Sequence, residues 1–414
     1  MKNLYFYRKW ILFTLFNFVI LAAVGVLLRY KILFPLPAVE QKHLLHGHSH
    51  FAFAGWVSLS LYVLTIYLIQ PGEVLLKKLE WLLVAQQMAS YGMLFSFPFT
   101  GYATVSISFS TASIFISWAF AWLVLRELNQ NKQKSIENKW IITGQWCNIL
   151  SSLGTFTLAY LMVTKNLRQD WYFGSVYFFL HFQYNGFFLF SIGALFINVL
   201  SNNLQLVYAT IANRFFNLLL FSLLPAWFLS LMWMRIPQWM YITGVGGAII
   251  QLGALWYFIQ IVRLHKQYFQ TAVQPIAKWF WYTAGAAFSV KIILQALSAI
   301  PQLNTYAFGV RPIVIGFLHL VLLVFVSMFL IGYFLDKGML VTKNKSAKLM
   351  ATGVLISVLL NEVFLMLQGV AAMSYHTIPY MNHALLICAI FIFLSLSGLL
   401  LYQYKKSPAR NSRT

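Results

Sequence analysis

The sequence is short of charged residues and of cysteine, and each shortage excludes a class of protein. Only 9% of the 414 residues are charged and 60% are hydrophobic, whereas about a quarter of the residues of a soluble domain are charged. The two cysteines, Cys147 and Cys388, lie inside apolar runs, so neither a disulfide framework nor a thiolate metal site is expected. No Cys-x-x-Cys-His motif occurs, which excludes a covalently attached c-type haem.

Acidic residues are the rarest charged type, with 8 Asp and Glu against 29 Lys and Arg. The resulting net charge of +21 would indicate a nucleic-acid partner only if the basic residues gathered on one soluble face. Here they lie between apolar runs, so we expect no nucleic acid and take the lipid bilayer as the partner. Of the eight acidic residues, only Glu362 lies well inside an apolar run, so a relay of carboxylates is not expected.

Apolar runs long enough to cross a bilayer recur along the whole chain, and each crossing needs about 20 residues. We therefore predict an all-α polytopic bundle of about twelve transmembrane helices. They form a single transmembrane domain over 1–404, followed by a short basic tail at 405–414. The predicted spans lie near 10–29, 43–69, 81–101, 104–125, 140–163, 172–200, 213–234, 239–262, 279–300, 312–335, 348–369 and 381–403.

The basic residues alternate between the two ends of these spans, which predicts the orientation. Lys2 and Arg8 precede the first span, Lys405 follows the last, and Lys132 and Lys134 lie between the fourth and fifth. Cytoplasmic connections carry such an excess of Lys and Arg. We therefore predict a multi-pass protein of the inner (cytoplasmic) membrane with both termini in the cytoplasm. Every even-numbered span then starts at the outer face.

Histidines inside the spans fall on even-numbered helices. His46 lies on the second span, His181 on the sixth and His319 on the tenth. At a rise of about 1.5 Å per residue, all three lie roughly 12–15 Å below the outer surface. A buried imidazole in a membrane is costly unless it is paired, hydrogen-bonded or ligating. The rings could therefore converge on one haem or metal site, or each could bond separately to backbone or Ser/Thr groups.

Four histidines lie close together at the outer start of the second span. His43, His46 and His50 share one helical face, and His48 points nearly the opposite way. Imidazole suits copper, zinc and iron, so this face could hold a metal. The alternative is a polar helix end that faces water.

Three segments resemble the haem-copper oxidase subunit I superfamily, which includes the large subunits of nitric oxide reductases. Residues 45–55, LHGHSHFAFAG, are similar to the second helix of cbb-type oxidases. Residues 181–188, HFQYNGFF, resemble the sixth helix of nitric oxide reductases, and residues 315–319, IGFLH, resemble the His-x-His of the tenth helix. The resemblance covers the whole chain in topology and these three segments in motif.

Carried over residue by residue, the resemblance implies that His46 and His319 ligate a low-spin b-type haem. It implies that His181 is one ligand of a second metal, copper or iron. Asn185 stands where the reductases carry a glutamate, Phe317 replaces the ligand of the high-spin haem, and the seventh span has no histidine. A haem held by two histidines has no open iron position for oxygen.

A second alignment leaves the ligand of the second span open. His48-Ser-His50 also resembles the His-x-His of nitric-oxide-response membrane proteins that bind haem and copper, which would make His50 rather than His46 a ligand. Arg311 lies about two helical turns before His319. Its guanidinium could bind a haem propionate or anchor the helix at the interface.

The sequence thus predicts a haem-binding membrane protein with a role in electron transfer or in O2 or NO chemistry, including an oxidase or nitric oxide reductase with an incomplete site. Other respiratory subunits, or a cytochrome or quinol donor, are the expected partners. Two alternatives remain: a twelve-helix secondary transporter without haem, and a metal-handling protein that uses the histidine face of the second span. In the transporter, Lys291 and Glu362 would line the path, or they could form an ion pair. No internal repeat is evident.

Overall fold

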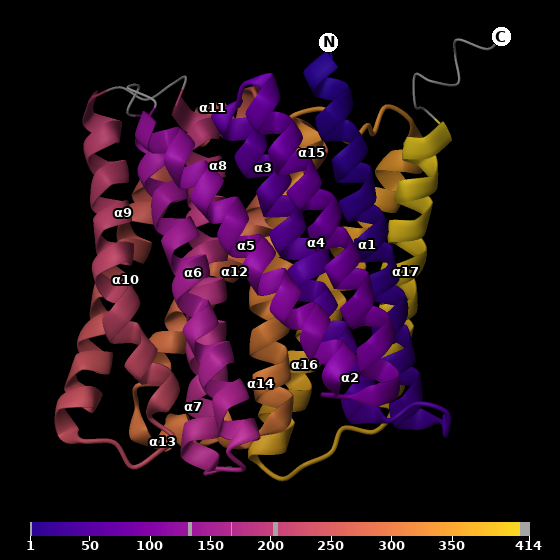
Figure 1. Cartoon of the computed structure of the whole chain (residues 1–414), viewed down its shortest axis with the longest axis vertical. Helices are drawn as coiled ribbons and strands as arrows, with labels where there is room; N and C mark the ends of the chain where they lie inside the picture. The colour runs from indigo at the N-terminus through magenta and orange to yellow at the C-terminus, as the bar shows by residue number, and fades with distance from the viewer. Residues whose placement is uncertain (1, 131–134, 167, 202–205, 406–414) are drawn as a thin grey trace. The chain divides into compact units, whose positions relative to one another are not determined.

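The computed structural model describes residues 2–130, 135–166, 168–201 and 206–405, and every regular element within them is helical (Figure 1). Eleven helical segments are long and apolar enough to cross a membrane, judged by length and composition. The predicted all-α polytopic architecture is therefore confirmed. The helix at the predicted third span, α4 (Glu73–Thr100), has 28 residues but is less apolar than the eleven. The predicted tail lies outside the described residues except for Lys405.

Residues 1–120, 274–284 and 327–414 form one of two compact units, which we call unit 1. Helix α1 packs along α17, and the Arg8 guanidinium lies 3.5 Å from the carbonyl oxygen of Gln403, so α1 begins on the side where α17 ends (Figure 1). The helices of unit 1 are α1 (Lys2–Leu33), α2 (Gln41–Phe51), η1 (Ala52–Ser58), α3 (Leu59–Ile69), α4 (Glu73–Thr100), the first part of α5 (Thr104–Gln130), the first part of α12 (Pro275–Leu297), α15 (Met328–Asp336), α16 (Lys345–Met373) and α17 (Met381–Lys405).

Residues 121–273 and 285–326 form the second unit, unit 2. Within it α9 packs along α10, and α6 packs against the continuous helix made by α7, η2 and α8 (Figure 1). Besides the remaining parts of α5 and α12, its helices are α6 (Ile136–Val163), α7 (Gln169–Leu180), η2 (His181–Phe188), α8 (Leu189–Ser201), α9 (Leu206–Trp227), η3 (Phe228–Leu231), α10 (Gln238–Leu264), α11 (Lys266–Thr271), α13 (Pro301–Gly309), α14 (Arg311–His319) and η4 (Leu320–Ser327).

The seventh span departs from the straight helix predicted over 213–234. Helix α9 contains Pro225, ends at Trp227 and continues as one short 3₁₀ turn, η3. Proline has no N–H to donate and clashes with the preceding turn, which weakens the helix around it. The altered backbone matters for the site, because a carbonyl two residues before Pro225 receives a side-chain hydrogen bond from the sixth span.

Close helix contact in unit 2 depends on small residues of α6. A Cβ placed on Gly154 would lie 2.5 Å from the carbonyl oxygen of Ser175, and one placed on Gly144 would lie 3.2 Å from Oγ of Ser191. Gly186 of η2 lies equally close to Cys147. Small residues let membrane helices approach until backbone and side-chain polar groups meet. The polar side chains on this face of α6 are therefore brought directly against η2 and α8.

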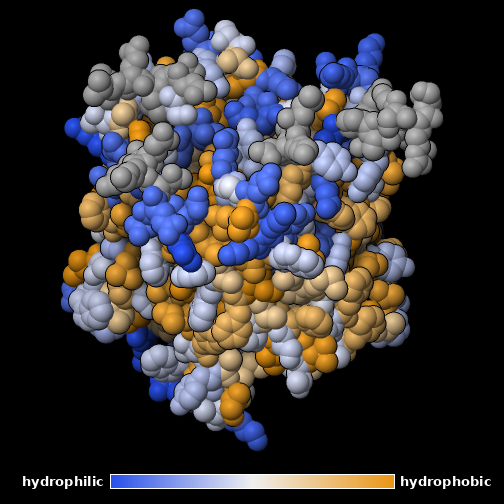
Figure 2. All heavy atoms as spheres, turned by 45° about the horizontal axis from the view of Figure 1, so that its top comes forward, coloured by the Kyte–Doolittle hydropathy of each residue, from blue (hydrophilic) through white to orange (hydrophobic). Residues whose placement is uncertain are grey.

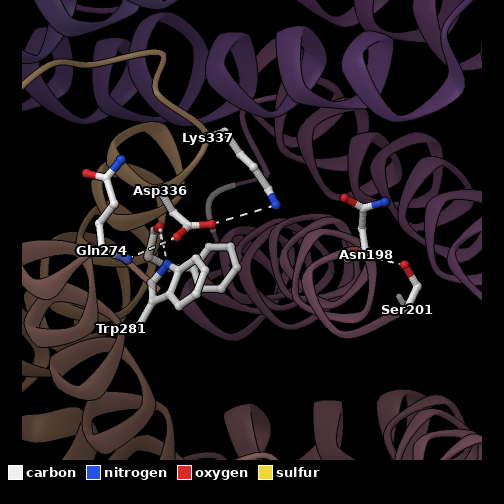
Figure 3. Close-up of polar contacts among 7 residues, drawn as sticks. Asn198, Ser201, Gln274, Trp281, Asp336 and Lys337 are labelled. Carbon is white, nitrogen blue, oxygen red and sulfur yellow. Dashed lines mark hydrogen bonds and ion pairs between the residues drawn. The ribbon is translucent and has the colours of Figure 1, made fainter. Parts of the chain in front are cut away.

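The largely buried carboxylate of Asp336 links two helices of unit 1. Asp336 accepts a hydrogen bond from the backbone N–H of Gln274 at 3.4 Å, and its other oxygen lies 3.6 Å from Nζ of Lys337 (Figure 3). Trp281 donates its indole N–H to the carbonyl oxygen of Phe329 at 3.4 Å. These contacts join the end of α15 to the start of α12.

The surface is apolar over a wide area, as expected for helices that face lipid. Figure 2 shows hydrophobic side chains covering much of the lower part of the face in view, with hydrophilic ones gathered above them. Large exposed apolar side chains occur in both units, for example Trp81 at 74% and Ile249 at 63% exposure. A soluble protein rarely exposes so much contiguous apolar surface. The chain therefore belongs in a bilayer.

Candidate functional site

Three spans contain a π-helical segment directly at a histidine. Segment η1 begins two residues after His50, η2 begins at His181, and η4 begins directly after His319. The π-helix is rare, and single turns of it are frequent at functional sites. These spans are the second, sixth and tenth of the predicted twelve, so the feature returns every fourth helix.

The three segments align without a gap when their histidines are superposed. Residues 50–58 read HFAFAGWVS, residues 181–189 read HFQYNGFFL, and residues 319–327 read HLVLLVFVS. All three have Trp or Phe six residues after the histidine, and two have Gly one residue earlier. Our sequence predictions do not include this repeat, although its signal is present in the residues. In the alignment, His50 rather than His46 corresponds to His181 and His319.

In unit 1, His46 and His50 pack around the same aromatic pair. The His50 ring stacks on Phe97 with 4.4 Å between ring centroids and an interplanar angle of 8°, and its Nε2 lies 3.1 Å from the hydroxyl oxygen of Tyr102. The His46 ring meets Tyr102 edge-on at 4.8 Å. No hydrogen bond from a His46 ring nitrogen occurs within the described residues. Tyr102 was not among the predicted site residues.

The other two histidines of this stretch confirm the predicted division of faces. His43 lies against Gly101, where a Cβ would be 2.4 Å from its Nε2, and it pairs with Glu40 at 3.3 Å. His48 points toward Gly25 of α1 instead. Gly101 has φ +59°, a conformation that favours glycine, so both its backbone and the nearby imidazole disfavour a side chain.

A multi-histidine metal centre is not present in the part of the chain that the structure describes. Among those residues, no group of three or more His, Cys, Asp or Glu side chains is placed to hold a metal ion. The predicted face of His43, His46 and His50 therefore does not converge on one point, although the three residues share a side of the helix. This finding gives no support to the metal-handling alternative.

His181 is fully engaged by hydrogen bonds inside unit 2. Its Nε2 lies 2.7 Å from the carbonyl oxygen of Leu223, to which it donates, and its Nδ1 accepts from Nδ2 of Asn185 at 3.1 Å. The residue is completely buried. A neutral imidazole has one donor and one acceptor, and both are used. The arrangement matches the structural interpretation of this histidine, and a metal at His181 would have to displace Asn185 or Leu223.

His319 forms a hydrogen bond to the backbone of its own helix. Its Nδ1 lies 2.8 Å from the carbonyl oxygen of Ile315, one turn earlier. Because a carbonyl only accepts, Nδ1 carries the proton and Nε2 carries the lone pair. Metal-ligating histidines usually donate their other N–H to a carbonyl or carboxylate in this way. Arg311 is exposed at the start of α14, and its predicted role at a propionate stays a prediction.

The sixth and tenth spans lie side by side within unit 2. The rings of Tyr184 and Phe317 are 6.3 Å apart, and Tyr177 packs against Phe308 of α13, the short helix before the tenth span, at 5.5 Å. Phe317, which takes the place of the high-spin haem ligand in the resemblance, therefore packs against an aromatic ring of η2. The position two residues before His319 therefore has no side chain that can ligate a metal.

Two ionisable residues inside the spans lack hydrogen-bond partners among the described residues. Lys291 of α12 is completely buried in unit 2, and neither carboxylate oxygen of Glu362 in unit 1 has a partner, although this residue is only 7% exposed. Charged groups within a membrane are rare and are functional candidates by default. Comparison of the sequence with protein-family models and with curated proteins finds no match.

Proposed function

We propose that the chain is a membrane protein that binds b-type haem through histidines of its second and tenth spans, with a role in electron transfer or diatomic-gas chemistry. The observation that supports this most is the recurrence of a histidine within two residues of the start of a π-helical segment, at His50 and again at His319. The resemblance to the haem-copper oxidase superfamily in the same segments points to the same group.

The residues present suit haem iron as a ligand set. Imidazole is an established axial ligand of haem, and because Nδ1 of His319 donates its proton to the carbonyl oxygen of Ile315, the lone pair of the neutral ring is on Nε2. When bound, b-type haem supplies one-electron redox chemistry. The chain contributes the orientation of the rings: Ile315 fixes the tautomer of His319, and Phe97 and Tyr102 hold the ring of His50.

In the second span, we assign the ligand to His50 rather than His46. The π segment begins two residues after His50 and one residue after His319, and both segments end eight residues after the histidine on a serine, Ser58 and Ser327. Nδ1 of His50 carries the coordinating lone pair in the tautomer in which Nε2 donates its proton to the hydroxyl oxygen of Tyr102. His181 is left out of the ligand set, because both of its nitrogens are engaged by Leu223 and Asn185.

Optical spectroscopy of the purified protein tests the proposal. The full chain, made in a haem-sufficient host and purified in detergent, is examined oxidised, reduced with dithionite, and reduced under carbon monoxide. We expect sharp α and β bands on reduction that carbon monoxide leaves unchanged, because two imidazoles leave no open iron position. A carbon-monoxide-induced shift would show an open position. Absence of haem would contradict the proposal and favour the transporter alternative.

A pair of variants separates the two ligand assignments in the second span. His50→Ala is expected to lower haem affinity by more than about 100-fold, since even the outer-shell partners of ligating histidines change metal affinity 10–100-fold. His46→Ala, one helical turn away beside the same Tyr102, is expected to retain haem. The measurement is the haem-to-protein ratio after purification. Loss of haem in His46→Ala alone would return the assignment to His46.

A further inference from the structure

We propose that Lys291 is a proton-binding group in the interior of unit 2, connected by internal water to a row of polar side chains on η2 and α6. Lys291 is 0% exposed, and its Nζ has no hydrogen-bond partner among the described residues. An ammonium inside a membrane is costly unless it is paired or hydrated. The inference does not rest on haem binding.

The surroundings of Lys291 supply acceptors that also lack donors. Lys291 interacts electrostatically with His181, and His181 accepts a hydrogen bond from Asn185, whose own Oδ1 has no partner within the described residues. Gln295 lies one helical turn after Lys291 on the same side of α12, and its Oε1 also has no hydrogen-bond partner among the described residues. A buried water typically makes about three hydrogen bonds to such groups. The amine of Lys291 and these two amide oxygens are polar atoms of the kind that such waters satisfy.

A row of buried polar side chains lies along the contact between η2 and α6. Nε2 of Gln183 donates to Oδ1 of Asn148 at 3.0 Å and to Oγ of Ser151 at 2.8 Å. One turn earlier on α6, Gln145 is completely buried, and neither its amide nitrogen nor its amide oxygen has a partner among the described residues. Oγ of the facing Ser191 is also without one.

The polar atoms of Gln145 and Ser191 therefore lack partners within the described part of the chain, whereas Gln183, Asn148 and Ser151 bond to one another. Water molecules commonly bridge polar groups in such a row. Because Gln145 lies nine residues after the start of α6 at Ile136, the row leads from the interior toward the end of unit 2 where α6 begins. The close approach at Gly144 brings the α6 backbone against Ser191. A proton bound at Lys291 would therefore exchange with that side of the unit.

One flank of Lys291 is apolar. Its Nζ lies 5.9 Å from the ring of Phe288, which contacts the rings of Phe215, Phe258 and Phe325. These rings offer no hydrogen-bonding chain. The titratable groups on the facing segment of the sixth span are His181, which interacts with Lys291 electrostatically, and the phenols of Tyr177 and Tyr184. The polar groups that could accept a proton from Lys291 therefore lie on the sixth span.

The first test is a titration of the lysine itself. Full-length wild type, Lys291→Met and the control Lys266→Met, which removes an exposed lysine of unit 2, are labelled at the lysine side-chain nitrogen with ¹⁵N and placed in lipid nanodiscs. Infrared difference spectra are recorded from acid to alkaline pH. We expect a lysine step that wild type and Lys266→Met share and Lys291→Met has lost. Identical titrations of wild type and Lys291→Met would overturn the proposal.

The second test addresses the water and leaves Lys291 in place. Hydroxyl-radical footprinting labels side chains that lie beside internal water, and it is applied to wild type and to Gln145→Leu. We expect strong labelling of Phe182 and Cys147 in wild type, falling in Gln145→Leu to the level of the apolar Phe288. Labelling at the level of Phe288 in wild type would overturn the proposal. This test also decides the matter should Lys291→Met fail to fold, and neither test requires haem.

Discussion

Replacing His319 with alanine is expected to abolish the haem signal of the purified protein. The side chain is the only histidine of the tenth span, and its Nδ1–H bond to Ile315 presents Nε2 as a coordinating nitrogen. Removal of a ligating imidazole should lower haem affinity by more than about 100-fold, beyond the 10–100-fold effect of outer-shell changes. The Soret absorbance per protein, measured after purification in the presence of added haem, gives the result directly.

The matched control is His376→Ala. His376 is exposed in the connection between α16 and α17, where its Nδ1 bonds to the carbonyl oxygen of Ser374, and its removal should leave the spectrum unchanged. Equal haem content in wild type and His319→Ala would contradict the assignment. Loss of haem in both variants would instead indicate a general instability of the haem-free chain, which a circular dichroism melt would reveal.

The π segments affect how the side chains of the nearby histidines are oriented. A π-helical turn widens the helix and changes which residues share a face, so side chains before and after it are re-aimed relative to a regular α-helix. In unit 1 the widened turn is held from outside: Trp56 of η1 donates its indole N–H to Oγ of Ser327 at 2.8 Å. Fixing such a turn by buried hydrogen bonds is consistent with a role in positioning His50.

The spans were predictable because bilayer thickness dictates the length of an apolar run. The predicted second span near 43–69 corresponds to helix over Gln41–Ile69, and the predicted last span near 381–403 to Met381–Lys405. Helical spacing also placed His43, His46 and His50 on one face and His48 on another, as the structure confirms. The third span was harder to predict, because α4 carries polar residues such as Gln86 and Gln87 that bond to other helices.

The local backbone and the partners of the histidines could not be predicted in the same way. A π turn adds about one residue to a helical turn, and hydrophobic periodicity does not resolve so small a change in a span that is apolar on all sides. The two bonds of His181 depend on Leu223, 42 residues away, next to a proline that alters the helix. The repeat of the three segments that begin at His50, His181 and His319 is present in the sequence. It becomes evident when the segments are aligned by the positions of their π-helical turns.

The second large effect is expected for Asn17→Leu, because Asn17 donates a hydrogen bond to a backbone carbonyl of the π segment η1. Asn17 is completely buried in α1, and its Nδ2 donates to the carbonyl oxygen of Gly55 at 2.7 Å and to Oε1 of Gln87 at 2.8 Å. Its Oδ1 accepts from Nε2 of Gln87 and from the hydroxyl of Tyr91, each at 3.0 Å. All four hydrogen-bonding positions of the amide are therefore used.

Leucine has a similar volume but offers none of these bonds, so Gly55 would keep a buried carbonyl without its side-chain donor. An unsatisfied buried group costs about 1–3 kcal/mol, and we expect at least this loss in the free energy of unfolding, measured by SDS titration with tryptophan fluorescence. Gln87→Leu is the matched control, because it removes two of the bonds but leaves Asn17 on Gly55, and it should cost less. If Asn17→Leu were as stable as wild type, the π segment would not depend on this bond. If it were destabilised and also lost haem while Gln87→Leu retained it, the geometry of η1 would be tied directly to the ligand at His50.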